Sequence, residues 1–168
     1  AAQLIQEYKN IGEFRSMEQL SQSILEDMGD FGAYNARLRG IMYEGVIFAE
    51  IHTYRFDEAI KNIQKFLSDK YNSEKCNAGL CFYGVEAYLA KNNYRKAYNC
   101  AQRYLDTYDK ISRTEDPSID DLTFMCGNIF SKVKVLFCIA GIITSGVRIG
   151  NLSVIYDYFD RFDLDSER

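Results

Sequence analysis

The residues of this sequence that could carry out chemistry are one histidine, five cysteines and several groups of carboxylates. Nucleophilic catalysis needs a Ser or Cys whose proton is taken by a nearby base, most often a histidine. His52 would have to serve every candidate nucleophile of the chain. It lies near the end of a predicted helix, beside Thr53 and Tyr54, where a capping or turn role accounts for it. We therefore expect no catalytic residue and no enzyme activity.

The cysteines show no metal-binding pattern. Their number is odd and none forms a CxxC pair, whereas a zinc site needs two such pairs or cysteine combined with histidine. We predict that they are small buried residues of helices, with a disulfide between Cys76 and Cys81 as the open alternative. Free thiols are typical of a reducing compartment, which favours a cytoplasmic protein. The cysteines are Cys76, Cys81, Cys100, Cys126 and Cys138.

The carboxylates do not form a site either. Sequence neighbours such as Glu26 and Asp27 diverge on a helix, so they cannot work as a pair. The acidic stretch from Asp157 to Glu167 lacks the ligand spacing of a calcium loop, and we interpret it as the polar outer face of a last helix. The sequence also has no glycine-rich phosphate-binding motif. We expect no metal and no cofactor.

The charge balance restricts the class of partner. The 168 residues include 24 acidic and 20 basic ones, which gives a net charge of −4. Nucleic acids and anionic membranes are bound through clustered positive charge, so neither is expected. The longest apolar stretch, residues 135–144, is about half the length that a bilayer requires, so we expect no membrane insertion.

The elements that position these residues are predicted to be helices. Apolar residues recur at spacings of three and four, and almost no stretch alternates as a strand would. The single proline, Pro117, leaves long stretches free to be helical. We predict an all-α fold that forms one domain over residues 1–168. The predicted helices cover residues 1–11, 13–28, 33–53, 56–70, 74–91, 94–110, 118–146 and 151–163.

The predicted helix 118–146 has the clearest apolar stripe. Phenylalanines lie off this stripe, so we expect neighbours to cover the helix on more than one side and expect it to be the most buried element. The predicted stripe consists of Leu122, Met125, Ile129, Val133, Leu136, Ala140, Ile143 and Val147.

A short pattern returns at four predicted turns. Its copies begin at Gly12 (GEFRSM), Tyr54 (YRFDEA), Asn92 (NNYRKA) and Gly150 (GNLSVI). Each copy places a large apolar residue and, three positions later, a second apolar residue on one face of the next helix. This return predicts about four antiparallel helix pairs stacked into an array. The two positions are Phe14 and Met17, Phe56 and Ala59, Tyr94 and Ala97, and Leu152 and Ile155.

The pattern resembles the tetratricopeptide repeat family, in which the second helix of a pair begins with an aromatic residue followed three positions later by alanine. The best copy covers residues 81–105, where Tyr88 and Ala101 also fall at family positions. The spacings between equivalent residues are 42, 38 and 58, whereas the family repeat has about 34 residues. The departure predicts an irregular superhelical twist, above all before the fourth pair.

The resemblance implies a protein-binding or peptide-binding scaffold, because in this family the first helices of successive pairs line a concave binding surface. It places Phe82, Glu86 and Leu89 on that surface, with Glu44 and Phe48 from the preceding pair. Packing between repeats would use the same side chains, and this alternative stays open. These residues do not match the Lys and Asn of the family's carboxylate clamp. The acidic members predict a ligand with Lys or Arg beside an apolar anchor.

The two ends of the sequence favour a second hypothesis. The chain opens on AAQLIQEYKNI without Met and ends on DLDSER without a helix stop signal. We therefore expect it to be part of a larger protein. Under this hypothesis it is the sensory or assembly segment of a regulator, or of a repeat-bearing enzyme whose active domain lies elsewhere.

Overall fold

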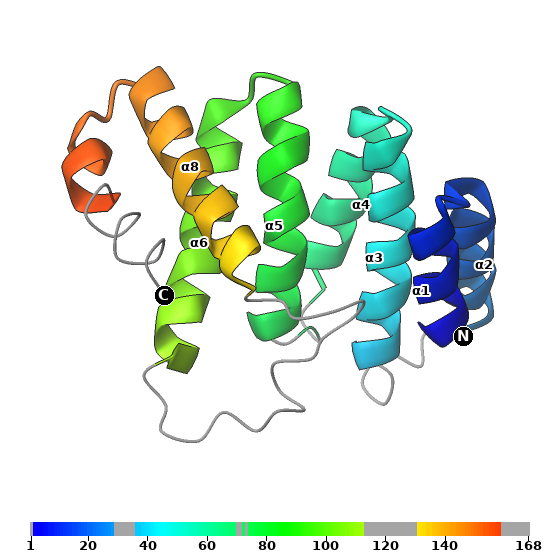
Figure 1. Cartoon of the computed structure of the whole chain (residues 1–168). Coiled ribbons are helices and arrows are strands. Elements are labelled where there is room, and N and C mark those ends of the chain that lie inside the picture. The colour runs from blue at the N-terminus through cyan, green and yellow to red at the C-terminus, as the bar shows by residue number, and fades with distance from the viewer. Residues whose placement is uncertain (1, 29–35, 70–71, 73, 113–130, 159–168) are drawn as a thin grey trace.

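A computed structural model describes residues 2–28, 36–69, 72, 74–112 and 131–158. All regular secondary structure in these ranges is helical, which confirms the predicted all-α class. Residues 153–158 form the start of a further helix after the last labelled one. The labelled helices are α1 (Ala2–Ile11), α2 (Phe14–Met28), α3 (Ala36–His52), α4 (Phe56–Leu67), α5 (Glu74–Ala90), α6 (Tyr94–Ser112) and α8 (Lys132–Arg148) (Figure 1).

The predicted helix boundaries hold well in the first two thirds of the chain. The helices from α1 to α6 begin and end within three residues of their predicted positions. The predicted helix 118–146 corresponds to α8 over its second half. Its first half, with Leu122, Met125 and Ile129, lies outside the described residues, as does the part of the last predicted helix after residue 158.

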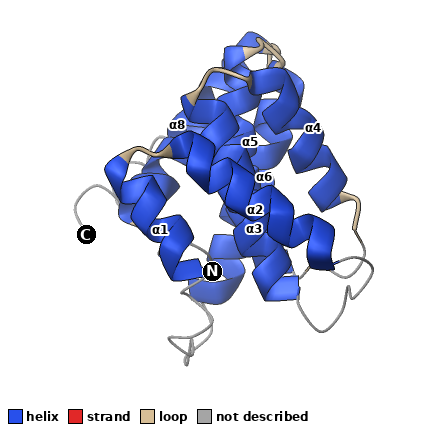
Figure 2. Ribbon diagram, turned by 90° about the vertical axis from the view of Figure 1, so that its right-hand side faces the viewer, coloured by secondary structure: helices blue, strands red, loops and turns tan. Residues whose placement is uncertain are grey.

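The helices form antiparallel pairs that stack side by side (Figure 1). α1 pairs with α2, α3 with α4 and α5 with α6, and each second helix also packs against the first helix of the next pair. The first helices contact one another in order, α1 with α3, α3 with α5 and α5 with α8. Figure 2 views the stack from the α1–α2 end. Each pair is therefore held by both helices of its neighbour.

The turns within the pairs share one backbone geometry. Gly12, Tyr54, Asn92 and Gly150 have positive φ angles of 77°, 60°, 56° and 83°. In each turn the N–H of this residue donates to the carbonyl three residues earlier, and the next N–H donates to the carbonyl five residues earlier. This is the Schellman arrangement, which satisfies the last carbonyls of a helix. The four copies of the sequence pattern therefore mark four equivalent turns.

The residues after each turn pack the second helices against their partners. Met17, Ala59, Ala97 and Ala101 are fully buried. In α4 the buried residues Ala59, Ile63 and Phe66 recur at spacings of four and three, so they share one face. Phe14, Phe56 and Tyr94 are half-buried at the start of their helices, and Tyr88 is buried on α5.

The fourth copy of the pattern differs from this arrangement. Leu152 and Ile155 are 59% and 37% exposed, whereas Val154 between them is buried. The reason is the close approach at Gly146, where a Cβ atom would lie 2.5 Å from Val154 Cγ2. Val154 therefore packs against Gly146. The residue that packs on the partner helix is Val154 and not Ile155, which is one position later.

The predicted buried face of α8 is also incorrect. Val133 and Val147 are 77% and 41% exposed, and among the described helices α3 and α5 each have more buried residues than α8. The face that packs on α5 and α6 carries small residues, which permit a close approach. At Gly141 a Cβ atom would lie 2.5 Å from Val85 Cγ1. The buried residues of α8 are Val135, Cys138, Ile139, Gly141, Ile142, Ser145 and Gly146.

Within the part of the chain that the structure describes, no helix combines the length and the apolar content needed to cross a membrane.

Candidate functional site

The first helices α3 and α5 reach solvent along a narrow stripe. Between residues 40 and 51 of α3, only Phe48 is not buried, and between residues 76 and 88 of α5 only Phe82 and Glu86 are not buried. Leu89 extends the α5 part of the stripe by one turn and is half-buried. Because these α5 residues follow spacings of four and three, they lie on one face. Four of the five predicted groove residues therefore form an open stripe, defined as Phe48, Phe82, Glu86 and Leu89.

The fifth predicted groove residue, Glu44, lies inside the protein with 2% of its surface exposed. Its Oε1 accepts a hydrogen bond of 2.6 Å from Tyr83 Oη and lies 3.8 Å from Lys9 Nζ. A buried carboxylate requires such partners because burial removes its hydration. Glu44 thus links α1, α3 and α5 beneath the open stripe and is not available to a ligand in this arrangement.

Aromatic rings connect the open stripe across three helices. Phe48 contacts Tyr83 edge to face with ring centroids 6.2 Å apart, and Tyr83 contacts Phe82 at 5.0 Å. Phe82 in turn contacts Phe137 of α8 at 5.3 Å. Edge-to-face contacts fix ring orientation in addition to burying area. Phe48, Tyr83, Phe82 and Phe137 form a continuous series that we call the aromatic row.

Cations lie over two rings of the aromatic row. Lys9 Nζ is 4.1 Å from the ring centroid of Phe48, and Lys134 Nζ is 5.3 Å from that of Phe82. The His52 ring stacks on the ring of Phe48 with centroids 3.8 Å apart. Its Nδ1 lies 2.9 Å from the Phe48 carbonyl oxygen. His52 therefore has a turn and packing role, as its sequence position predicts.

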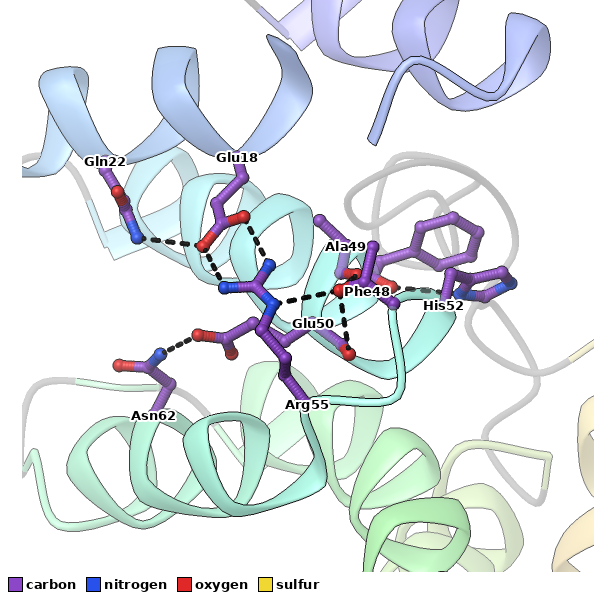
Figure 3. A network of polar contacts seen from close by, with 9 residues as sticks. Glu18, Gln22, Phe48, Ala49, Glu50, His52, Arg55 and Asn62 are labelled. Atoms are coloured by element: carbon purple, nitrogen blue, oxygen red, sulfur yellow. Dashed lines mark hydrogen bonds and ion pairs between the residues drawn. The ribbon is translucent and has the colours of Figure 1, made fainter. Parts of the chain in front are cut away.

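A second polar site, which the sequence analysis missed, lies where α2, α3 and α4 meet (Figure 3). Arg55 makes a two-point ion pair with Glu18 of α2, with Nη1 to Oε1 at 2.9 Å and Nη2 to Oε2 at 2.5 Å. Beside it, Asn62 Nδ2 donates to Glu50 Oε1 at 2.8 Å. We call Glu18, Glu50, Arg55 and Asn62 the junction cluster. It joins the first helix pair to the second.

Glu50 is the unusual member of the junction cluster. It is 2% exposed, and its Oε2 has no hydrogen-bond partner among the described residues. Burial raises the pKa of Glu50 to about 7. The hydrogen bond from Asn62 and the charge of Arg55 lower this pKa, whereas Glu18 and Glu58 raise it. The carboxyl therefore exchanges a proton near neutral pH.

Aligning the four turns supplies a sequence signal for Glu50. The residue four positions before the positive-φ residue is Tyr8 in the first pair and Tyr88 in the third, but it is Glu50 in the second. In the fourth pair this position is Gly146, so Glu50 is the one acid among the four equivalent positions. Tyr83 and Phe137, by contrast, carry no comparable signal, because aromatic residues are frequent in the whole chain.

The cysteines of the described ranges behave as predicted. Cys76, Cys81, Cys100 and Cys138 are buried free thiols, so the alternative of a Cys76–Cys81 disulfide is not realised. A hydrogen bond with Cys81 and burial raise the pKa of Cys100, and burial raises that of Cys138, whereas the same hydrogen bond lowers the pKa of Cys81. Cys100 and Cys138 are therefore held in the protonated form, which is a poor nucleophile. Cys126 lies outside the described residues.

The geometry can support binding and proton exchange. In the described ranges, no three His, Cys, Asp or Glu side chains converge as metal ligands would. Of the acidic C-terminal stretch, Asp157 is described and exposed, and residues 160–167 lie outside the described ranges. The open stripe and the junction cluster are therefore the two sites to explain.

Comparison of the chain with protein-family models, with curated proteins and with solved structures finds no significant match.

Proposed function

We propose that this chain is a protein-binding or peptide-binding scaffold of tetratricopeptide type, with no catalysis of its own. The observation that carries the proposal is the open stripe. Residues 40–51 of α3 and 76–88 of α5 are buried except at Phe48, Phe82 and Glu86. A protein interface commonly combines aromatic anchors with a polar rim, and these side chains have that composition.

The helix-pair arrangement supports the same proposal. The turns of the helix pairs have equivalent backbone hydrogen bonds, and the first helices of successive pairs contact one another. Side chains of successive first helices therefore lie in a row. The aromatic row runs along that layer from α3 to α8. A rigid row of rings binds an apolar side chain without losing much conformational freedom, because its own rings are already packed.

The expected ligand is a peptide that carries a large apolar residue next to Lys or Arg. Glu86 is the acidic member of the open stripe, whereas Glu44 is occupied by Tyr83 and Lys9. We therefore assign the preference for a basic residue to Glu86 alone. The preference should weaken as salt concentration rises, since the pair forms at the surface.

The test uses peptides selected from a displayed random library on the intact chain. Phe82→Ala and Glu86→Lys should weaken the selected peptides at least about tenfold, the size typical of an interface anchor. The matched controls are Tyr98→Ala, a half-buried aromatic residue on α6, and Asp106→Lys, an exposed acid on α6. If both stripe variants bind the peptides with the affinity of the parent chain and keep its helical content, the binding site lies elsewhere and the proposal is refuted.

A further inference from the structure

The junction cluster contains more negative charge than its single guanidinium can neutralise. Glu18 from α2, Arg55 from the turn and Glu58 from α4 are the charged groups that act on Glu50 in the described part of the chain. Arg55 directs both of its terminal nitrogens to Glu18. An ionised Glu50 would therefore be a buried carboxylate whose one direct partner is the amide of Asn62. Such a group strongly favours any arrangement that lets water reach it.

The contact that would open is the one between the first two pairs. The Glu18–Arg55 ion pair spans α2 and the α3–α4 turn, and α2 packs directly on α3. At Gly45 of α3 a Cβ atom would lie 2.4 Å from Ser21 Oγ of α2, so the two helices touch closely there. Ser21 Oγ is itself buried without a hydrogen-bond partner in the described part of the chain. The interface thus contains two polar groups that gain hydrogen bonds when α2 moves away.

Solvent lies close to the cluster. A cavity of about 590 Å³ between α2, α3 and α4 is lined in part by Gln22 and Asn62. Gln22 Nε2 donates to Glu18 Oε1 at 3.3 Å, and Asn62 donates to Glu50. Two of the side chains that line the cavity, Gln22 and Asn62, are therefore direct partners of the two carboxylates, and Asn62 places the cavity one residue away from Glu50.

We propose that Glu50 is a proton-operated latch on the docking of the α1–α2 pair against the α3–α4 pair. When Glu50 carries a proton, Glu18 is the one ionised carboxylate of the junction cluster. Its ion pair with Arg55 then holds the two helix pairs together. When Glu50 releases that proton to water, a buried carboxylate remains whose one direct partner is Asn62, and α2 separates more readily from α3 and α4. The latch does not depend on a partner and holds whether or not the open stripe binds a peptide.

The sign of the pH effect follows from the direction of the shift. The pKa of Glu50 is about 7 in the docked state and close to the ordinary 4.5 when water reaches the carboxyl. The stabilising contribution of the proton is fully present below the lower value and is lost as pH rises through the higher one. The equilibrium constant for docking falls by up to about tenfold per pH unit, or roughly 300-fold in all, of which roughly 100-fold falls between pH 5 and pH 8.

Hydrogen exchange of the intact chain measures this docking directly. After correction for the intrinsic rate, amides of α2 should lose protection by roughly 100-fold from about pH 5 to about pH 8, whereas amides of α6 in the same sample should not. Glu50→Gln, which stays neutral and keeps an oxygen for Asn62, should show in α2 at pH 8 the protection of the parent at pH 5. Glu13→Gln, which removes one exposed acid from the α1–α2 turn outside the junction cluster, should behave as the parent does.

Two results would overturn the latch. Equal pH profiles for α2 and α6 in the parent protein would do so without any variant, so the test holds even if Glu50→Gln folds poorly. A pH-dependent loss of α2 protection that persists in a folded Glu50→Gln variant would assign the effect to another group.

Discussion

The turn between α3 and α4 and the turn between α5 and α6 have the same backbone and different side chains. Both use the Schellman hydrogen bonds around a residue of positive φ, Tyr54 in one and Asn92 in the other. Four residues before these positions stand Glu50 and Tyr88. One residue after them stand Arg55, which makes no side-chain cap bond to α4, and Asn93, whose Oδ1 accepts a bond from Lys96 N.

The partners of these residues differ in the same way. Gln22 of α2 and Gln64 of α4 stand at equivalent positions after their own turns. Gln64 Nε2 donates to Tyr88 Oη at 3.1 Å, which ties the second pair to the third with neutral groups. Gln22 donates to Glu18 instead, and the first and second pairs are joined by charges.

The comparison separates what the fold requires from what it tolerates. The positive φ, the two backbone bonds and the small buried residue after each turn are shared, so they specify the helix pair. Glu50 and Arg55 replace groups that are neutral in the sister turn, and the buried Glu50 costs stability when it is ionised. Residues that depart from a repeat in this way are candidates for a function other than folding.

The largest expected effect concerns the small buried residue that follows both turns, Ala59 in one and Ala97 in the other. Ala97→Trp should lower the free energy of unfolding by about 3 kcal/mol and Ala59→Trp by nearly as much, since both alanines are fully buried and the added volume has no space. Chemical denaturation measures the change. Ala90→Trp, at an exposed alanine of α5, is the control. A near-parental stability in both variants would mean that the register of the pairs is wrong.

A smaller effect is expected for the α3–α4 turn, which we call the charged turn because it carries Glu50 and Arg55. Arg55→Ala should destabilise the chain by about 2 kcal/mol at pH 8, because it leaves Glu18 and Glu50 together without a cation, and the partial exposure of Arg55 limits the loss. The loss should shrink at pH 5, where Glu50 carries a proton. Arg95→Ala, an exposed arginine of α6, should change the unfolding free energy little at either pH. The same loss at both pH values would exclude coupling between Arg55 and Glu50.

The smallest effect is expected for the α5–α6 turn, which we call the neutral turn because Tyr88 and Asn93 stand at the same positions. Asn93→Ala should cost about 1 kcal/mol, the usual value of a helix cap, and this loss should not depend on pH. Thermal unfolding at pH 5 and pH 8 tests both statements. A pH-dependent loss at Asn93 would remove the distinction between the two turns.

Particular residues show how far the sequence could predict this molecule. The helices and turns follow from apolar spacing and from the returning pattern, and both depend on local geometry that a sequence records. The buried face of α8 could not be predicted, because that helix is apolar on several sides and the choice depends on how Gly141 and Gly146 meet Val85 and Val154. The stripe residues Phe82, Glu86 and Leu89 were placed on an open face through the repeat register.

The charges of the sites were harder to predict. Glu44 has the composition of a groove residue, but Tyr83 and Lys9 come from other helices to enclose it. The ion pair of Glu18 with Arg55 joins residues 37 positions apart, which spacing alone does not indicate. Tertiary contacts between pairs decide which carboxylates are buried, and this determines their chemistry.

The most direct test of the account is the titration of the Glu50 carboxyl itself. Carbon-13 NMR of glutamate-labelled protein resolves each carboxyl carbon, and the Glu50 signal is the one lost in Glu50→Gln. The account predicts a midpoint near pH 7 for Glu50, well above the ordinary glutamate value of 4.5. A Glu50 midpoint near the ordinary value of 4.5 would show that the charged turn carries no proton switch and would contradict the distinction between the two turns.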